Sequence, residues 1–380
     1  MFLKIVMEMR IKMEVEFSVL RRQYQRYEKE WEEAGLRVMR SGQYILGEEV
    51  RKFENEFAKY LGVRHCVGVG NGLDALRLAL EGLGIGAGDE VIVPANTFIA
   101  TALAVSETGA KPVFVDVDLY FGICASEIER AVTKNTKAVM VVHLYGQPCD
   151  MDSIMEVSRK HNLYVVEDCA QSHGAYYRGC LTGTFGDVAC FSFYPTKPIG
   201  ALGDAGAVVT NQLDVAERVR MLRNYGSQKK YQHELLGYNS RMDEIQAAFL
   251  QVALRHEREG ANERQKIAAM YLKEIKNDKM ILPQLREGTE HVFHIFPIFP
   301  AQGFGREEIC KYFKAHGVYT QIHYPIPCHL EECYKDLSYH VGDIPYAEYC
   351  AASEISLPMY IGMTIEEAEY VIQVANDFPR

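Results

Sequence analysis

V-V-E-D-C-A-Q-S (165–172) and F-S-F-Y-P-T-K-P (191–198) are the two stretches of this sequence that decide its fold. In each, a short apolar run ends at polar residues. Continuous apolar runs of this length predict parallel strands that are buried on both faces. Polar side chains beyond the carboxyl ends of such strands lie where α/β proteins bind ligands. We therefore expect Asp168 and Lys197 to face one site at the edge of a sheet.

Further strand-like runs lie on both sides of these stretches. V-G-V-G, V-I-V-P, P-V-F-V-D-V, A-V-M-V-V-H and G-A-V-V-T alternate with helical patterns between residues 67 and 210. This alternation predicts an α/β fold in which helices cover both faces of a mostly parallel sheet. The periodicity also predicts a helix over about 14–39 and a long helical region over about 242–276.

The same patterns predict how the chain is divided. The expected parts are an N-terminal segment and helix (1–40), a large domain (41–255) and a smaller C-terminal α+β domain (256–380). Residues 1–17 alternate apolar and charged side chains. Both an extra strand and a loosely ordered leader fit that alternation, and it matches no secretory signal.

Composition narrows the classes of function. The 380 residues are 48% hydrophobic, enough for two cores, and the net charge is −10. An acidic chain argues against nucleic acid as a partner. No run of 18 apolar residues occurs, so we expect no membrane span. Ten cysteines lie in the sequence without a C-x-x-C pair. That pattern favours a reducing cytoplasm and predicts no metal site.

The chemistry of Asp168 and Lys197 points to one cofactor, pyridoxal 5'-phosphate (PLP). A lysine amine can hold the cofactor aldehyde as a Schiff base, and a carboxylate can face the protonated pyridine nitrogen. The segment G-V-G-N-G-L-D-A-L (68–76) leads from a strand into a helix. Its glycines and helix N-terminus suit a phosphate group, although an ordinary strand-to-helix turn fits the same letters.

Taken together, the motifs resemble the DegT/DnrJ family of PLP-dependent sugar-nucleotide aminotransferases, from about residue 20 to the C-terminus. Besides the segments quoted above, the resemblance rests on V-I-V-P-A-N-T-F-I-A-T (91–101), H-L-Y-G-Q (143–147), G-D-A-G-A-V (203–208), R-N-Y-G-S (223–227) and G-Y-N-S-R-M-D-E-I-Q-A-A (237–248). It implies a fold-type-I aminotransferase with catalytic Lys197. Related sugar dehydratases lack this lysine, so Lys197 argues against that alternative. A non-catalytic regulatory member of the fold is the remaining alternative.

The resemblance also implies which residues hold the cofactor. The amides of Gly72 and Leu73 and the Ser192 hydroxyl are expected on the phosphate, Phe98 on the ring face, and Gln171 on the ring hydroxyl. Asn239 is expected to reach the phosphate of the other subunit, which implies a homodimer with shared sites. Three of these residues also have simpler explanations, namely core packing for Phe98 and helix capping for Gln171 and Asn239.

Two segments indicate the substrate. The basic residues of 223–241, including Lys229, suit a diphosphate, although a solvated loop fits them equally. His323, Tyr324 and His329 lie among prolines in Q-I-H-Y-P-I-P-C-H-L (321–330) and suit a hexose or a packed core. Both strings resemble the branch that aminates C-3 of dTDP-linked 3-keto-6-deoxyhexoses. We expect that nucleotide sugar as acceptor and glutamate as donor; C-4 amination and a UDP-linked 3-keto sugar are the alternatives.

Overall fold

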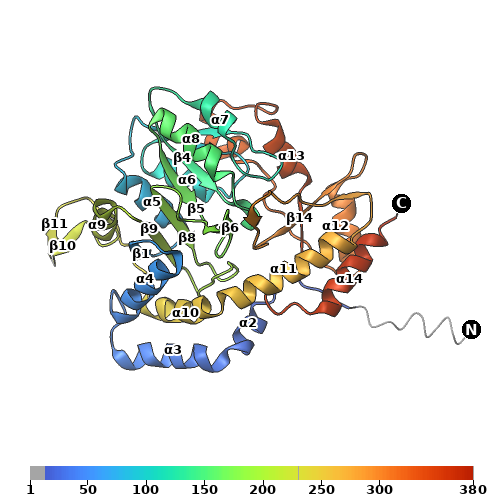
Figure 1. Cartoon of the computed structure of the whole chain (residues 1–380), viewed down its shortest axis with the longest axis horizontal. Coiled ribbons are helices and arrows are strands. Elements are labelled where there is room, and N and C mark those ends of the chain that lie inside the picture. Colours follow the sequence, from blue (N-terminus) through green and yellow to red (C-terminus); the bar gives the residue numbers. More distant parts are fainter. Residues whose placement is uncertain (1–12, 230, 380) are drawn as a thin grey trace, which may run out of the picture.

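A seven-stranded sheet forms the centre of the computed structural model, which describes residues 13–229 and 231–379 (Figure 1). Its strand order is β1-β9-β8-β5-β4-β2-β3. Strand β9 alone runs opposite to the other six, pairing antiparallel with both β1 and β8. The strands are β1 (His65–Val69), β2 (Glu90–Pro94), β3 (Lys111–Val115), β4 (Thr136–Val142), β5 (Tyr164–Asp168), β8 (Val188–Ser192) and β9 (Gly206–Thr210). The α/β fold and all seven predicted strands are confirmed.

The sheet is buried on both faces because its side chains alternate between two cores. In β2, Val91 and Val93 pack into the core under α5, α6 and α9, whereas Ile92 between them packs into the opposite core. This alternation follows from the two-residue period of a strand. The helices around the sheet are α3 (Glu28–Ser41), α4 (Glu48–Leu61), α5 (Gly72–Gly82), α6 (Ala100–Glu107), α7 (Ala125–Ala131), α8 (Met151–His161), α9 (Leu213–Leu222) and α10 (Glu244–Arg255).

A smaller α+β region follows α10. Helix α11 (Glu257–Glu274) continues almost directly from α10 and runs towards this region (Figure 1). The predicted long helical region is thus two helices that meet at His256. The region contains α12 (Arg306–Ala315), α13 (Pro345–Ser353), α14 (Ile365–Asn376) and a three-stranded sheet of β12 (Met280–Ile281), β14 (Phe296–Pro300) and β15 (Ile355–Leu357).

Short elements complete the described structure. Two-residue strands form one further sheet of β6 (Tyr176–Tyr177), β7 (Cys180–Leu181) and β13 (Thr289–Glu290), and a hairpin pairs β10 (Ser227–Lys229) with β11 (Gln232–His233). The 3-10 turns are η1 (Leu144–Gly146), η2 (Cys328–Leu330) and η3 (Glu332–Leu337). The N–H of Cys328 donates to Ala95 O at 2.9 Å, so η2 lies against the end of β2.

The N-terminal part differs from the expected single helix over 14–39. The chain forms α2 (Leu20–Arg26) and α3, which are separated at Tyr27. Val15 instead pairs with Val318 of the smaller region, donating its N–H to Gly317 O at 2.8 Å and accepting from Tyr319 N at 3.0 Å. This pairing satisfies backbone groups that a helix start would leave without partners. Residues 1–12, which hold most of the alternating segment, lie outside the described residues.

The predicted domain boundaries stay a prediction, but the cores show which segments pack together. Val15 lies in the core of the smaller region, whereas Trp31 and Val38 of α3 pack against α4 and α10. The N-terminal segment therefore contributes to both regions. None of the helices formed by the described residues combines the length and apolar composition of a membrane-spanning segment.

Candidate active site

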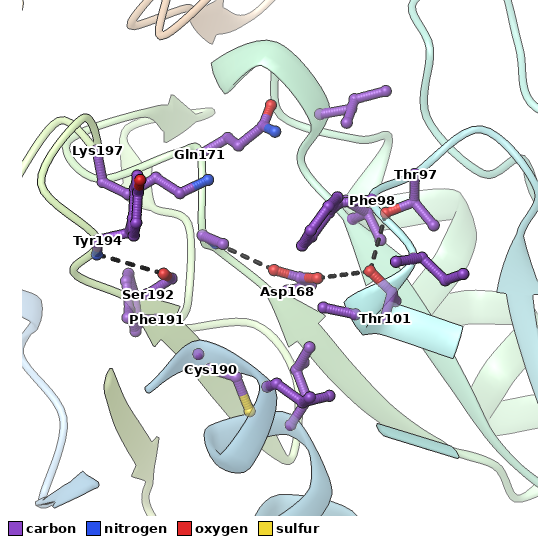
Figure 2. A pocket seen from close by; sticks show the side chains of 18 of the residues that line it. Thr97, Phe98, Thr101, Asp168, Gln171, Cys190, Phe191, Ser192, Tyr194 and Lys197 are labelled. Carbon is purple, nitrogen blue, oxygen red and sulfur yellow. Dashed lines mark hydrogen bonds between the residues drawn. The ribbon is translucent and has the colours of Figure 1, made fainter. Parts of the chain in front are cut away.

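The candidate site is a cavity of about 530 Å³ at the carboxyl edge of the central sheet. Asp168 ends β5 and Ser192 ends the adjacent parallel strand β8, so both residues reach the same edge. Lys197 enters from the loop after β8 (Figure 2). The structure thus brings together the two residues that the sequence singled out, although they lie on separate segments.

Asp168 is held firmly at the floor of the cavity. Its Oδ1 accepts from Ala170 N at 3.1 Å, and its Oδ2 accepts from the Thr101 hydroxyl at 2.9 Å (Figure 2). Burial raises the pKa of the Asp168 carboxyl, while these two donors and the charge of Lys197 oppose the rise. A cationic N–H placed against this carboxylate would stabilise its charged form.

Lys197 lies on a tight turn. Its backbone N–H donates to Tyr194 O at 2.8 Å, and a side chain at Gly200 would come within 2.5 Å of Pro195 O. The half-buried ammonium loses solvation, and this lowers the pKa of Lys197 to about 8 despite the opposing charge of Asp168. A much larger neutral fraction than in an ordinary lysine follows, and the neutral amine is the nucleophilic form.

The start of α5 provides an anion site on the same cavity. Gly72 and Leu73 are its first residues, and helix N-termini present N–H groups that lack intrahelical acceptors. Asn71 caps the helix by accepting from Asp74 N at 2.9 Å. A Cβ at Gly72 would lie 2.6 Å from Ser192 Cβ, so glycine permits the helix start to touch Ser192. Both backbone amides and a hydroxyl therefore converge there.

An aromatic pair closes another side of the cavity. Phe98 is 52% exposed, and its ring lies 5.2 Å from that of Tyr324 at an interplanar angle of 40°. Gln171 Nε2 donates to the Tyr324 hydroxyl at 3.1 Å, and Gln171 Oε1 accepts from Tyr145 N at 2.6 Å. Gln171 thus links the strand-end residues to Tyr324, and its second amide hydrogen can serve a ligand oxygen.

His323 reaches the cavity from the smaller region. Its Nδ1 lies 2.8 Å from the Ser356 hydroxyl, and its backbone N–H donates to Glu354 at 2.6 Å. Burial, followed by the charge of Lys197, lowers the pKa of His323 to about 4. The ring is therefore neutral near pH 7 and offers a hydrogen bond without a charge.

Three predicted residues do not line this cavity within the chain. Lys229 lies exposed in the β10–β11 hairpin, and Asn239 is exposed beside the bridge to Asn224. His329 is buried, with its Nε2 3.2 Å from Glu348 and its ring edge-on to Tyr339. The structure therefore places His329 in packing, since its buried ring faces neighbours of the chain itself.

Sequence reasoning missed several residues of the site. Thr101 bonds Asp168, Tyr145 bonds Gln171, and His294 lines the cavity. Thr101 ends the segment V-I-V-P-A-N-T-F-I-A-T and is the second residue of α6. A hydroxyl residue shortly after a predicted strand end could therefore have indicated that Thr101 belongs to the site. No pattern in the sequence indicates that His294 belongs to the site.

These features fit PLP. The cavity combines an amine with a lowered pKa, a buried carboxylate that has no ion-pair partner among the described residues, and backbone amides at a helix start. When bound, PLP supplies an aldehyde that exchanges amino groups and a ring that withdraws electrons. The fold and the site define a PLP-dependent aminotransferase.

Comparison with known proteins agrees with this class. The DegT/DnrJ/EryC1/StrS aminotransferase family matches residues 25–375, and the chain belongs to this family. A dTDP-3-amino-3,6-dideoxy-alpha-D-galactopyranose transaminase of Aneurinibacillus thermoaerophilus is 47% identical over 365 residues, covering 96% of this chain and 99% of the relative.

A second relative and a crystal structure are similar to this chain over most of its length. A "Pleiotropic regulatory protein" of Geobacillus stearothermophilus is 44% identical over 347 residues, covering 90% of this chain and 92% of the relative. The crystal structure of S. venezuelae DesV in complex with a ketimine intermediate superposes with a TM-score of 0.93 at 44% identity, covering 96% of this chain and 98% of that one.

Proposed function

We propose that the protein transfers an amino group from glutamate to C-3 of a dTDP-linked 3-keto-6-deoxyhexose. The observation that carries this proposal is the convergence of Lys197 and Asp168 on one cavity. The chain that holds this cavity is 47% identical to a dTDP-3-amino-3,6-dideoxyhexose transaminase along nearly its whole length. The strong likeness supports the C-3 branch over the C-4 alternative.

Each residue of the cavity has a part in this function. Gly72, Leu73 and Ser192 bind the cofactor phosphate, and Phe98 covers the ring face. Asp168 keeps a proton on the ring nitrogen because its carboxylate is buried and fixed by Thr101. Lys197, as a neutral amine, moves the proton between the reacting carbons.

The substrate side of the cavity is the aromatic and imidazole wall. Tyr324 and His323 carry a hydroxyl and a neutral ring that suit the hydroxyl groups of a hexose. Gln171 orients Tyr324 through its 3.1 Å hydrogen bond. We assign both residues to sugar binding and leave His329 to packing.

The active unit is a homodimer with shared sites in this proposal. Asn239 and Lys229 are exposed and lie outside the cavity of their own chain, which suits residues that reach the cavity of a partner. Asn239 would reach the cofactor phosphate and Lys229 the substrate diphosphate. Mixing Lys197→Ala with Asn239→Ala chains tests this arrangement, because one hybrid site carries both lesions and the other carries neither. Absence of recovered activity despite demonstrated subunit exchange would contradict shared sites.

A substrate panel tests the reaction itself. Purified PLP-loaded protein is incubated with glutamate and one of three acceptors: a dTDP-linked 3-keto-6-deoxyhexose, its 4-keto isomer or a UDP-linked 3-keto sugar. Mass spectrometry of the products is expected to show amination of the first. Preferred amination of either other acceptor would overturn the proposed branch, and inertness towards all three would favour a regulatory function.

A further inference from the structure

A small polar recess continues the cavity beyond Lys197. It has a volume of about 30 Å³ and shares Thr196, Lys197 and His294 with the main cavity. A water molecule needs roughly 10–15 Å³ of such space, so the recess holds two or three waters or a group of similar size. A carboxylate fits this space, whereas a sugar ring does not.

Arg264 of α11 lines this recess and is incompletely paired. The residue is 4% exposed, and its Nε donates to Val292 O at 3.1 Å. Its Nη2 is buried and has no hydrogen-bond partner within the described part of the chain. A buried guanidinium donor without an acceptor is costly, because its lost hydration is not replaced. The carboxylates of Glu257 and Glu263 lie near Arg264, but neither accepts a hydrogen bond from Nη2. An acceptor placed in the recess, a water or an anion, could therefore satisfy this donor.

The neighbouring groups do not supply a second permanent cation. Burial, followed by the charges of Lys197 and Arg264, lowers the pKa of His294 well below its ordinary value, so this ring is neutral. Lys197 must lose its own charge to act as a nucleophile. Among the described residues that line the cavity or the recess, Arg264 is therefore the one cation that stays charged throughout the reaction.

We propose that this recess binds the α-carboxylate of the amino donor through Arg264. The recess adjoins Lys197, and an α-carboxylate is one bond from the carbon whose proton Lys197 moves. Planar guanidinium and carboxylate groups also match in a two-pronged hydrogen bond. The inference rests on the proposed function, and it adds the residue that selects an α-amino acid as donor.

The binding of 2-oxoglutarate to the PLP-loaded protein tests this assignment by calorimetry. This keto acid carries the same α-carboxylate as glutamate but no amino group to transfer. In Arg264→Gln we expect its Kd to rise by at least about 30-fold, roughly 2 kcal/mol. Arg258→Gln is the matched control, since Arg258 lies on the same helix and is 54% exposed, and its Kd is expected to stay within about twofold.

Measuring the half-reaction with glutamate and the half-reaction with the keto sugar separately distinguishes a donor-binding role of Arg264 from a general loss of activity. The rate of 2-oxoglutarate formation from glutamate is expected to fall in Arg264→Gln, whereas amination of the keto sugar by the amino-loaded protein stays within about twofold. If Arg264→Gln does not fold, Arg264→Lys replaces it, with an expected rise in Kd of about tenfold. Unchanged keto-acid affinity in the folded variant would overturn this inference alone. Wild-type protein that forms no 2-oxoglutarate from glutamate would overturn the proposed donor and this inference together.

Discussion

The half of the site built on the central sheet and the half built on the smaller region are organised differently. Asp168 and Ser192 sit at the ends of adjacent parallel strands, so the sheet itself fixes their separation. His323 and Tyr324 lie on an irregular segment, and their positions depend on contacts with Ser356, Gln171 and Phe98. In the proposed function, the chemistry common to the class therefore lies on the rigid half, and selection of the sugar lies on the half that is held by side-chain contacts.

The largest effect is expected at Lys197. Lys197→Ala removes both the cofactor anchor and the proton carrier, and we expect turnover to fall by at least about 10⁴-fold. Folding is expected to persist because the change removes a poorly solvated amine without breaking a side-chain hydrogen bond of the described structure. Steady-state rates and thermal unfolding of the variant measure both outcomes. Turnover near that of the wild type would refute the role of Lys197.

A smaller loss is expected when the carboxylate of the rigid half is neutralised. Asp168→Asn keeps the shape of the side chain and can still accept from Thr101, but it no longer stabilises a protonated ring nitrogen. We expect turnover to fall by about 100-fold, measured under saturating substrates. A loss of less than about tenfold, roughly 1.4 kcal/mol, would show that Asp168 does not face the ring nitrogen.

The pH dependence of cofactor addition reports the environment of Lys197. Only the neutral amine adds to the aldehyde, and the pKa of Lys197 in the folded protein is about 8. The rate of PLP addition to the cofactor-free protein should therefore fall about tenfold per pH unit below about 8 and level off above it. Because Asp168 raises the pKa of Lys197, Asp168→Asn should move the plateau to lower pH. If the rate of PLP addition keeps rising beyond about pH 10, as it would for an ordinary lysine, desolvation does not lower the pKa of Lys197.

The smallest effects should distinguish sugar binding from packing within the second half. Tyr324→Phe removes the hydroxyl that accepts from Gln171, and we expect KM for the keto sugar to rise about three- to tenfold while the donor half-reaction is unchanged. His329→Phe instead breaks the contact with Glu348 and should lower the free energy of unfolding by about 1–3 kcal/mol. If His329→Phe raised KM for the keto sugar without changing the free energy of unfolding, His329 would contribute to substrate binding and not to packing.

The rigid half was more predictable from the sequence than the other half for a physical reason. Apolar runs identify buried strands, and the ends of parallel strands meet at one edge, so the amino-acid pattern alone groups Asp168 and Lys197. His329 lies only six residues from His323, yet one ring lines the cavity and the other is buried elsewhere. Side-chain direction in an irregular segment is set by tertiary contacts, and no sequence period encodes it. The late start of the N-terminal helix, at Leu20 and not near residue 14, depends likewise on a tertiary contact, the pairing of Val15 with Val318.

Transfer of isotopically labelled nitrogen from glutamate tests the central claim most directly. The PLP-loaded protein is mixed with labelled glutamate and a dTDP-linked 3-keto-6-deoxyhexose, and the product is analysed by nuclear magnetic resonance. We predict that the label appears on C-3 of the sugar and that Lys197→Ala yields no labelled product. The proposed reaction would be contradicted if the label appeared on another carbon of the sugar. It would also be contradicted if the wild-type protein formed 2-oxoglutarate from glutamate but left the sugar unlabelled.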